Sequence, residues 1–199
     1  MKPANRMELL ASKQQKKLAE KGHSLLIKKR DALIREFFRA IKEYQEAEEQ
    51  TKRELARAND LLQRSQAISG SNRVKGIALS TEAKMEVHFE KKNIMGVRVP
   101  KIALALEEYP QNTSPIGTCH YVTQTQEIFS ELLPKIISLA ELEQTIYALA
   151  DEIKKTKRRV NALEHIRIPQ IQQEIKQIRE RLEEREREEF VRIKHLKKR

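Results

Sequence analysis

The sequence predicts an all-α-dominated fold: a long antiparallel two-helix coiled coil with a small head, containing a β-hairpin, at the turn. Three observations predict it. Apolar residues recur at steps of three and four over two long segments, which is typical of a coiled-coil seam. The composition, 35% charged and 5% aromatic in 199 residues, is too polar for a thick globular core and suits long two-faced helices. The stretch between the segments loses this pattern and holds four of the five glycines and three of the six prolines.

Residues 1–69 are predicted to form the first coiled-coil helix, from Arg6 to about Ser69. They contain no proline after Pro3, and strong helix formers dominate. Gly22 is the one weak position, since a mid-helix glycine costs about 1 kcal/mol relative to alanine. A helix of about 60 residues spans about 90 Å and outruns any core that this chain could build, so it needs a partner helix. Its apolar stripe is Leu26, Leu33, Phe37, Ala40 or Ile41, Tyr44, Ala47, Thr51, Leu55, Ala58, Leu62 and Ser65.

Residues 70–126 are predicted to form the small head. Capping and turn residues at positions 69–72 end the first helix, and Val74–Lys84 is compatible with a short helix. Apolar and polar residues alternate before and after Lys91-Lys92-Asn93, which predicts a β-hairpin over about residues 85–99 with one apolar face, ended by Pro100. Residues 109–121 are interpreted as an irregular loop. The apolar residues of the hairpin are Met85, Val87, Phe89, Met95, Val97 and Val99.

Residues 127–199 are predicted to form the second coiled-coil helix. We place Pro134 in or near its first turns, where a missing N–H is least costly. Farther on, the steps between apolar residues lengthen, and Pro169 leaves the carbonyl of His165 without its usual donor, so we expect a mild kink there. The unbroken part of the seam is Leu139, Leu142, Ile146, Leu149, Ile153, Thr156, Val160 and Leu163.

The register of the two helices is the least determined feature. Facing core positions in an antiparallel pair have residue numbers with a constant sum, and a sum of 200 sets Tyr44 against Thr156. The same register would make Met1 meet Arg199 and leave the head at the other end. A slip of one heptad would also satisfy both stripes, so the periodicity leaves the register open.

The net charge of +11 is concentrated at the two chain ends. Residues 1–30 contribute +7 and residues 176–199 contribute +4, while the residues between them are neutral overall. An antiparallel pair would bring both ends to one basic tip. Solubility is one explanation of this charge, and long-range attraction to an acidic or polar partner is the other. The basic-tip residues are Lys13, Lys16, Lys17, Lys28, Lys29 and Arg30.

No stretch of the sequence carries a recognisable active site. There is no GxxxxGK loop, and five scattered histidines with the single cysteine, Cys119, make no metal-ligand spacing. We therefore expect no catalytic, cofactor-binding or metal-binding residue and no bound nucleotide. No apolar run approaches the roughly 18 residues of a membrane span, and residues 1–20 are too polar for a signal peptide. These observations predict a soluble, cytoplasmic protein without an internal disulfide.

Four stretches of the sequence form a distinctive set. The first is Arg6–Leu10 with Lys21–Asp31, and the second is the hairpin motif at residues 93–100. The third is Thr156–Glu164 followed by Ile168-Pro169, and the fourth is Leu182–Glu189 followed by Arg192-Ile193-Lys194. Together they resemble the D subunit of V-type and A-type rotary ATPases over nearly the whole chain. The hairpin motif comprises Asn93, Ile94, Met95, Gly96, Val97, Arg98, Val99 and Pro100. The shaft signature comprises Arg158, Arg159, Val160, Asn161, Ala162, Leu163, Glu164 and Pro169.

The resemblance implies a non-catalytic central-stalk rotor subunit that transmits torque between a nucleotide-binding hexamer and a membrane ion-translocating ring. It also implies three kinds of partner: the catalytic and regulatory hexamer subunits around the chain ends, the small F subunit on the side, and the subunit capping the membrane ring at the head. The protein would then be peripheral to the membrane as part of that complex. Proton or sodium coupling, and the direction of the reaction, remain open.

Two other classes of protein fit the composition. A basic antiparallel coiled coil with a pI near 9.7 could lie along RNA as a nucleic-acid-binding arm. Against this class, the head lacks a clustered aromatic platform for stacking bases. A scaffold coiled coil is the other class, and it gives no reason for a hairpin head at the turn.

Overall fold

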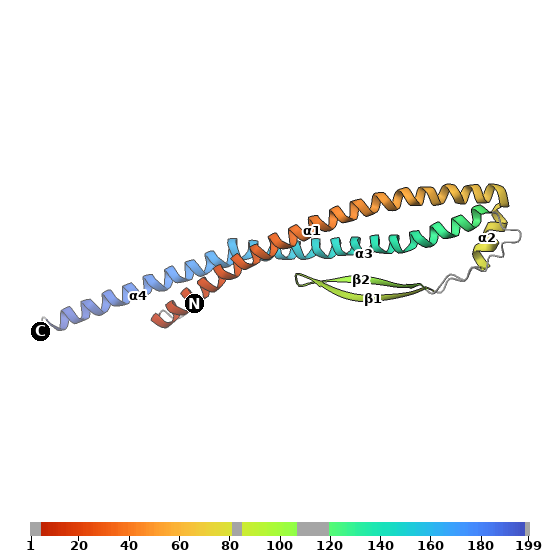
Figure 1. Ribbon diagram of the computed structural model, residues 1–199. Helices are drawn as coiled ribbons and strands as arrows, with labels where there is room; N and C mark the ends of the chain where they lie inside the picture. The colour runs from red at the N-terminus through yellow and green to blue at the C-terminus, as the bar shows by residue number, and fades with distance from the viewer. Residues whose placement is uncertain (1–4, 81–84, 107–119, 198–199) are drawn as a thin grey trace. The chain divides into compact units, whose positions relative to one another are not determined.

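The computed structural model describes residues 5–80, 85–106 and 120–197. They divide into two compact units, and each is described by itself. Unit 1 contains the chain up to Ile34 together with Glu152 onward, and unit 2 is Arg35–Asp151. Within each unit a stretch of the first long helix runs antiparallel to a stretch of the second helical segment (Figure 1). The predicted coiled coil with a hairpin-bearing insertion is confirmed.

The first helix, α1, spans Arg6–Ser69, as predicted. Asn5 caps its start, because its Oδ1 accepts a hydrogen bond from the N–H of Glu8 at 2.7 Å. Gly70 ends it with a φ of 83°, the left-handed conformation that glycine adopts at helix ends. Helix α2 follows at once over Ser71–Ser80, so it begins before the predicted Val74; residues 81–84 lie outside the described residues.

Helix α3 spans His120–Ala162, so the predicted start at Glu127 is wrong by seven residues. Packing explains the difference: Val122 and Thr125 are buried, and this burial outweighs the modest helix propensity of β-branched side chains. Pro134 consequently lies inside the helix rather than in its first turns, which corrects that prediction as well. Most of the loop predicted over residues 109–121 lies outside the described residues.

A single π-helical turn, η1, spans Leu163–Arg167 and separates α3 from α4, which spans Ile168–Leu196. The N–H of Ile168 donates to the carbonyl of Leu163, five residues back, so this turn holds one residue more than an α-helical turn. The disturbance expected beside Pro169 therefore takes the form of a π turn. The extra residue also accounts for the lengthened apolar steps on this part of the chain.

Strands β1 (Met85–Ile94) and β2 (Val97–Leu106) form an antiparallel hairpin. The predicted turn at residues 91–93 is wrong, because the two turn residues are Met95 and Gly96, with φ of 52° and 87°. Two consecutive positive φ angles define a type I′ turn, which matches the twist of the strands. Asn93 holds the turn through its Oδ1, which accepts a hydrogen bond from the N–H of Gly96 at 2.8 Å.

Strand β2 continues past Pro100, where we predicted its end. Pro100 pairs with Lys91, and counting from the closing pair Ile94–Val97 makes this a non-hydrogen-bonded pair. The nitrogen of Pro100 therefore points away from β1, and the missing N–H removes no bond between the strands.

The prediction of one apolar face is also wrong. The pairing has no interruption, so Val97 and Val99 share one face while Val87 and Phe89 lie on the other. Val97 and Val99 are buried, whereas Val87 and Phe89 are 40% and 73% exposed. The predicted turn has three residues and the observed turn has two, so odd-numbered residues now pair with even-numbered ones, and this change exchanges the faces.

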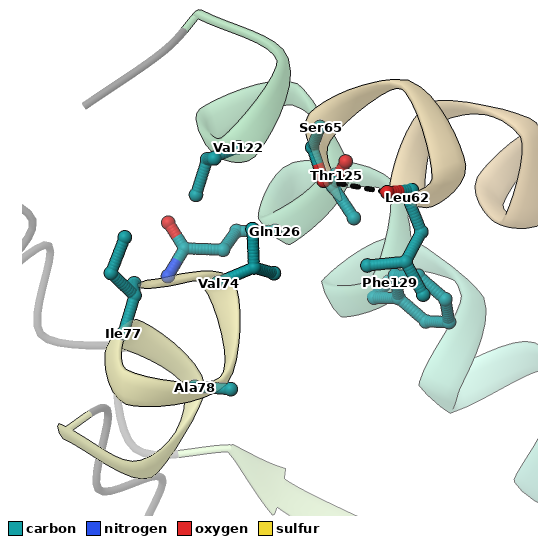
Figure 2. A pocket seen from close by; sticks show the side chains of 9 residues that line it. All are labelled: Leu62, Ser65, Val74, Ile77, Ala78, Val122, Thr125, Gln126 and Phe129. Atoms are coloured by element: carbon teal, nitrogen blue, oxygen red, sulfur yellow. Dashed lines mark hydrogen bonds between the residues drawn. The ribbon is translucent and has the colours of Figure 1, made fainter. Parts of the chain in front are cut away.

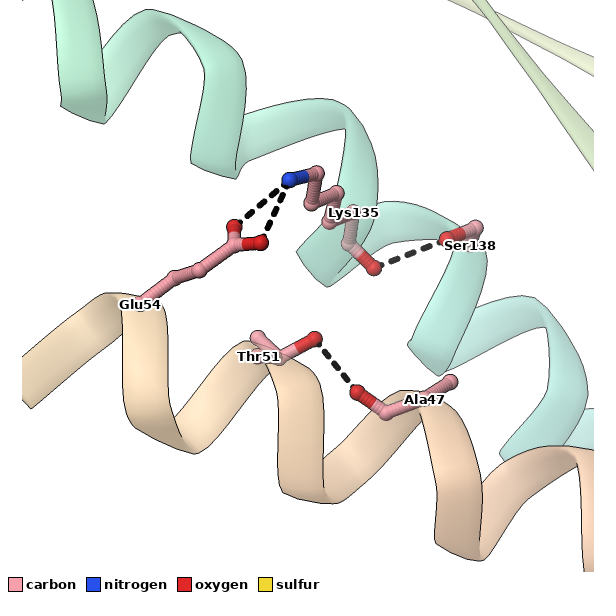
Figure 3. Close-up of polar contacts among 5 residues, drawn as sticks. All are labelled: Ala47, Thr51, Glu54, Lys135 and Ser138. Atoms are coloured by element: carbon pink, nitrogen blue, oxygen red, sulfur yellow. Dashed lines mark hydrogen bonds and ion pairs between the residues drawn. The ribbon is translucent and has the colours of Figure 1, made fainter.

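The seam between the long helices is thin and rich in small or hydroxyl side chains. All eight predicted seam residues from Leu139 to Leu163 are buried or half-buried. Of the predicted apolar stripe on α1, Leu55 alone is exposed, and the other members are buried or half-buried. Several buried hydroxyls donate to carbonyls of their own helix, as Thr51 does to Ala47 at 2.7 Å (Figure 3). Alanines and threonines let the helices approach closely but bury little apolar area.

Candidate functional site: the paired helices and their exposed surfaces

Ion pairs between the antiparallel helices determine their register. In unit 2 the Lys135 Nζ lies 2.6 Å and 2.7 Å from the two carboxylate oxygens of Glu54 (Figure 3). A constant sum of 200 would set Glu54 opposite Ile146, which lies eleven residues, or about 16 Å along the helix, from Lys135. Two side chains cannot bridge that distance. The predicted register is therefore wrong.

Unit 1 gives the same result. Arg6 Nη2 lies 2.8 Å from Glu186 Oε1, and Lys29 Nζ lies 3.3 Å from Glu152 Oε1. These residue numbers sum to 192 and 181 rather than 200. A heptad slip preserves apolar contacts on both stripes, so the charged residues that flank the seam distinguish between registers that the apolar residues do not.

The end of α4 extends beyond its pairing with α1. Arg6 pairs with Glu186, and the hydrogen bond to that carboxylate raises the pKa of Arg6. Helix α4 then continues for ten residues to Leu196. Met1 and Arg199, predicted to meet, lie outside the described residues. Beyond Glu186 the helix carries exposed apolar side chains, namely Phe190, Val191, Ile193 and Leu196.

The predicted basic-tip residues lie along α1 in unit 1. From Lys13 to Arg30 they extend over about 25 Å of helix. Three of them have acidic partners: Lys16 with Glu20 at 3.5 Å, Lys29 with Glu152 at 3.3 Å, and Arg30 with Asp31 at 2.8 Å. The other three, Lys13, Lys17 and Lys28, are exposed.

A second basic group, which we call the positive collar, lies on α3 in unit 1. Five of the six residues at positions 154–159 are cations, all exposed, and no acidic residue occurs between Glu152 and Glu164. Consecutive helix positions are about 100° apart, so these cations cover the side of α3 away from the seam, while Thr156 faces the seam. Unit 1 carries a net charge of +13 and unit 2 of −2. The collar consists of Lys154, Lys155, Lys157, Arg158 and Arg159.

The remaining residues of the shaft signature surround the π turn. Val160 is buried in the seam, Leu163 and Pro169 are half-buried, and Asn161 and Ala162 are exposed. The structure also brings together a pair that the sequence did not reveal: His23 Nε2 of α1 lies 3.5 Å from Glu164 Oε2. In the sequence, only the positions of these two polar residues on opposite sides of the seam could have indicated the pair. Recognising that they face each other requires the correct register.

Helix α2 packs on the ends of α1 and α3 around an apolar cavity of about 190 Å³ (Figure 2). Helix α2 contributes Val74, Ile77 and Ala78, which face the long helices. On the outside of the same region Leu79 is 85% exposed and Ile68 is 61% exposed. The other lining residues are Leu62, Ser65, Val122, Thr125, Gln126 and Phe129.

The predicted hairpin residues divide between exposed and buried positions. Val97 and Val99 are buried, Ile94 and Pro100 are half-buried, and the others are exposed: Asn93, Met95, Gly96 and Arg98. The buried pair belongs to β2, and the N–H of Ile102 on the same strand donates to Glu141 Oε2 of α3 at 3.2 Å. Strand β2 therefore attaches the hairpin to α3.

The described residues offer several exposed surfaces for contact. Within residues 5–80, 85–106 and 120–197, no three His, Cys, Asp or Glu side chains gather as metal ligands would. None of the described helices is long and apolar enough to cross a membrane. The fold and its surfaces define a coiled-coil protein with a cationic side, an exposed helix end and an exposed strand.

Comparison with known proteins identifies the family. The family model for the ATP synthase D subunit matches residues 8–198. The D subunits of the A-type ATP synthases of Thermococcus sibiricus and Pyrococcus horikoshii are 42% and 43% identical to the chain, over 96% of it and 91% of each relative. The protein of the same name from Methanosarcina mazei is 40% identical over 98% of the chain and 94% of the relative. The chain belongs to the family of ATP synthase D subunits, which confirms the resemblance found in its motifs.

Proposed function

We propose that this chain is the central-stalk rotor shaft of a V/A-type rotary ATPase. In this role it transmits torque between the hexamer that hydrolyses or synthesises ATP and the membrane ring that moves ions. It performs no bond chemistry itself and binds no nucleotide or metal. It lies on the cytoplasmic side, peripheral to the membrane. The relatives, which are named as D subunits of A-type ATP synthases, support its assembly into such a complex.

The distribution of charge carries this proposal. A shaft that turns inside a ring needs attraction that changes little with its angle, because a strong contact at one angle would hold it there. The positive collar covers the outward side of α3, and the basic-tip residues lie along the paired α1, so cations occur on both helices of unit 1 rather than on one helix alone. The interhelical ion pairs of Arg6 and Lys29 oppose sliding of one helix along the other.

Each partner has a surface suited to it. We assign unit 1, with the collar and the exposed end of α4, to the catalytic and regulatory subunits of the hexamer. We assign the head, with exposed Leu79 and Ile68, to the subunit that caps the membrane ring, since exposed apolar residues are common at protein interfaces. The small F subunit would bind the side of unit 2, where Phe38 and Tyr147 are 64% and 62% exposed.

Recovery of the assembled complex tests the proposal. A tagged chain should recover nucleotide-binding ring subunits from its own cells. Reversal of four collar residues to glutamate should slow assembly with the ring and make it more sensitive to salt, because charges are screened over about 10 Å at 0.1 M salt. The substituted collar residues are Lys154, Lys157, Arg158 and Arg159.

A matched control carries four reversals to glutamate in unit 2, at exposed cations. This control should assemble with the hexamer as wild type does. Equal assembly rates for both variants at low salt would contradict the role given to the collar. Salt-sensitive recovery of RNA without ring subunits would replace the rotor proposal with nucleic-acid binding. The control positions are Arg35, Arg57, Arg73 and Lys75.

A further inference from the structure

Among the residues that the structure describes, none pairs with the outer hydrogen-bonding edge of strand β1. It pairs with β2 on one side, and the sheet formed by the described residues has only these two strands. Every residue from Glu86 to Asn93 is exposed, whichever face its side chain takes. With ten residues β1 is longer than the usual strand of about five or six. An edge of this length is a template for a further strand.

The other edge of the hairpin is already used. The outward N–H of Ile102 on β2 donates to Glu141 of α3 at 3.2 Å, and Pro100 has no N–H to offer there. Val97 and Val99 of the same strand are buried. Figure 1 shows β2 between β1 and α3. The protein therefore holds the hairpin through β2 and leaves the edge of β1 outward.

Strand β1 lacks two of the usual features that prevent strand addition, while its charged side chains, a third such feature, restrict which strands can be added. It contains no proline, and its pairing with β2 has no bulge. Val87, Phe89 and Lys91 occupy non-hydrogen-bonded pairs with β2, counting from the closing pair, so their N–H and C=O groups point away from β2. These groups are the ones that an added strand would bind.

The charges around the turn indicate the chemistry of the added strand. Residues 90–101 contain four cations and one acid, Glu90, which lies 3.9 Å from the Lys101 Nζ. Lys91, Lys92 and Lys101 line an open hollow beside Glu90. An acidic segment would complement this end of β1. An apolar segment would complement the other end, where Val87 and Phe89 are exposed on one face.

We propose that β1 binds an extended segment of a neighbouring subunit by β-strand addition. The segment places acidic residues near Lys91 and Lys92 and apolar residues beside Val87 and Phe89, while backbone hydrogen bonds supply the main contact. This inference rests on the proposed function only in that the neighbour is a subunit of the rotary ATPase.

Residue-resolved amide hydrogen exchange on the isolated chain and on the assembled complex tests the inference. In the complex the outward amides of Val87, Phe89 and Lys91 should exchange about tenfold or more slowly than in the isolated chain, because exchange then requires the added strand to open. The inward amides of His88 and Glu90, bonded to β2, should be protected in both samples.

A matched pair of variants isolates the edge from the side chain. Lys91→Pro removes an outward N–H opposite Pro100 and breaks no bond to β2, so it should abolish the added protection of Val87 and Phe89. Lys91→Thr keeps the N–H and should retain that protection. If the inward amides show that Lys91→Pro unfolds the hairpin, a Lys91→Glu and Lys92→Glu double variant replaces it and should reduce the protection by repelling the acidic segment.

Three results would overturn the inference. If the outward amides exchange as fast in a complex containing the ring subunits as in the isolated chain, no strand is added to β1, and the proposed function is unaffected. If protection of the outward amides in the isolated chain grows with protein concentration, the added strand comes from a second copy of this chain. A chain that recovers no ring subunits would overturn both proposals, and this result is read from the subunit composition before any exchange is measured.

Discussion

Replacing Thr156 by valine should stabilise the protein. Thr156 is 1% exposed in the seam of unit 1, and its hydroxyl has no hydrogen-bond partner among the described residues. Thr51 is a matched control, because it is 7% exposed in the seam of unit 2 but its hydroxyl donates to the carbonyl of Ala47 at 2.7 Å. Valine has the same branched shape and nearly the same helix propensity as threonine. The two substitutions thus differ mainly in the hydrogen bond.

The expected magnitudes follow from that difference. A buried hydroxyl without a partner costs about 1–3 kcal/mol, and Thr156→Val removes this cost. Thr51→Val loses a hydrogen bond with a net value of about 1 kcal/mol and gains burial of one methyl group, worth about 0.8 kcal/mol. We expect Thr156→Val to raise the free energy of unfolding by about 1–2 kcal/mol and Thr51→Val to leave it nearly unchanged.

Thermal and urea unfolding followed by circular dichroism at the helix band measures both effects. For a protein of this size, 1 kcal/mol corresponds to a shift in Tm of about 2–4 °C. Equal Tm values for the two variants, or a lower Tm for Thr156→Val, would refute the reasoning. Either result would mean that the Thr156 hydroxyl is satisfied in solution or that Thr156 does not face the seam.

Three further predictions address the register, the interior proline and the hairpin. In a double-mutant cycle of Glu54→Lys and Lys135→Glu, the double variant with the swapped pair should recover about 0.5 kcal/mol of unfolding free energy relative to the single variants, as expected of a partly exposed ion pair. A coupling energy of zero would contradict the register. Pro134→Ala should raise the Tm, since an interior proline costs up to about 3 kcal/mol relative to alanine, and an unchanged Tm would show that this cost is absent. Deleting Glu90–Ile94 should leave the helix signal in circular dichroism nearly intact while altering assembly or coupling, and loss of most of that signal would make the hairpin part of the core.

The helical seam could be predicted because its signal is repeated many times. Steps of three and four from Leu139 to Leu163 indicate one buried stripe, and every member is buried or half-buried. The bounds of α1 were equally clear, since Gly70 supplies the left-handed residue at its end. The register was not, because a heptad slip leaves the apolar stripes paired, and long side chains such as Lys135 and Glu54 decide between the alternatives.

The hairpin and the start of α3 depended on weaker signals. Alternation indicates a strand but does not locate a type I′ turn, and Met95-Gly96 is not one of the dipeptides typical of that turn. The first turns of α3 form because Val122 and Thr125 pack in unit 2, a contact that no local pattern reveals. The collar is visible in the sequence as a run of cations, but its position on the side of α3 away from the seam, with Thr156 facing inward, required the structure.

Direct observation of rotation tests the central claim. The complex is fixed to a surface through its ring, and a gold particle is attached to a single cysteine at Arg73→Cys, an exposed position in α2, with Cys119→Ser removing the native thiol. If the chain is the rotor shaft, the particle turns in one direction when ATP is added and stops when ATP is removed, while a particle on the ring stays still. A particle on Arg73→Cys that stays still while the same complexes hydrolyse ATP would contradict the account.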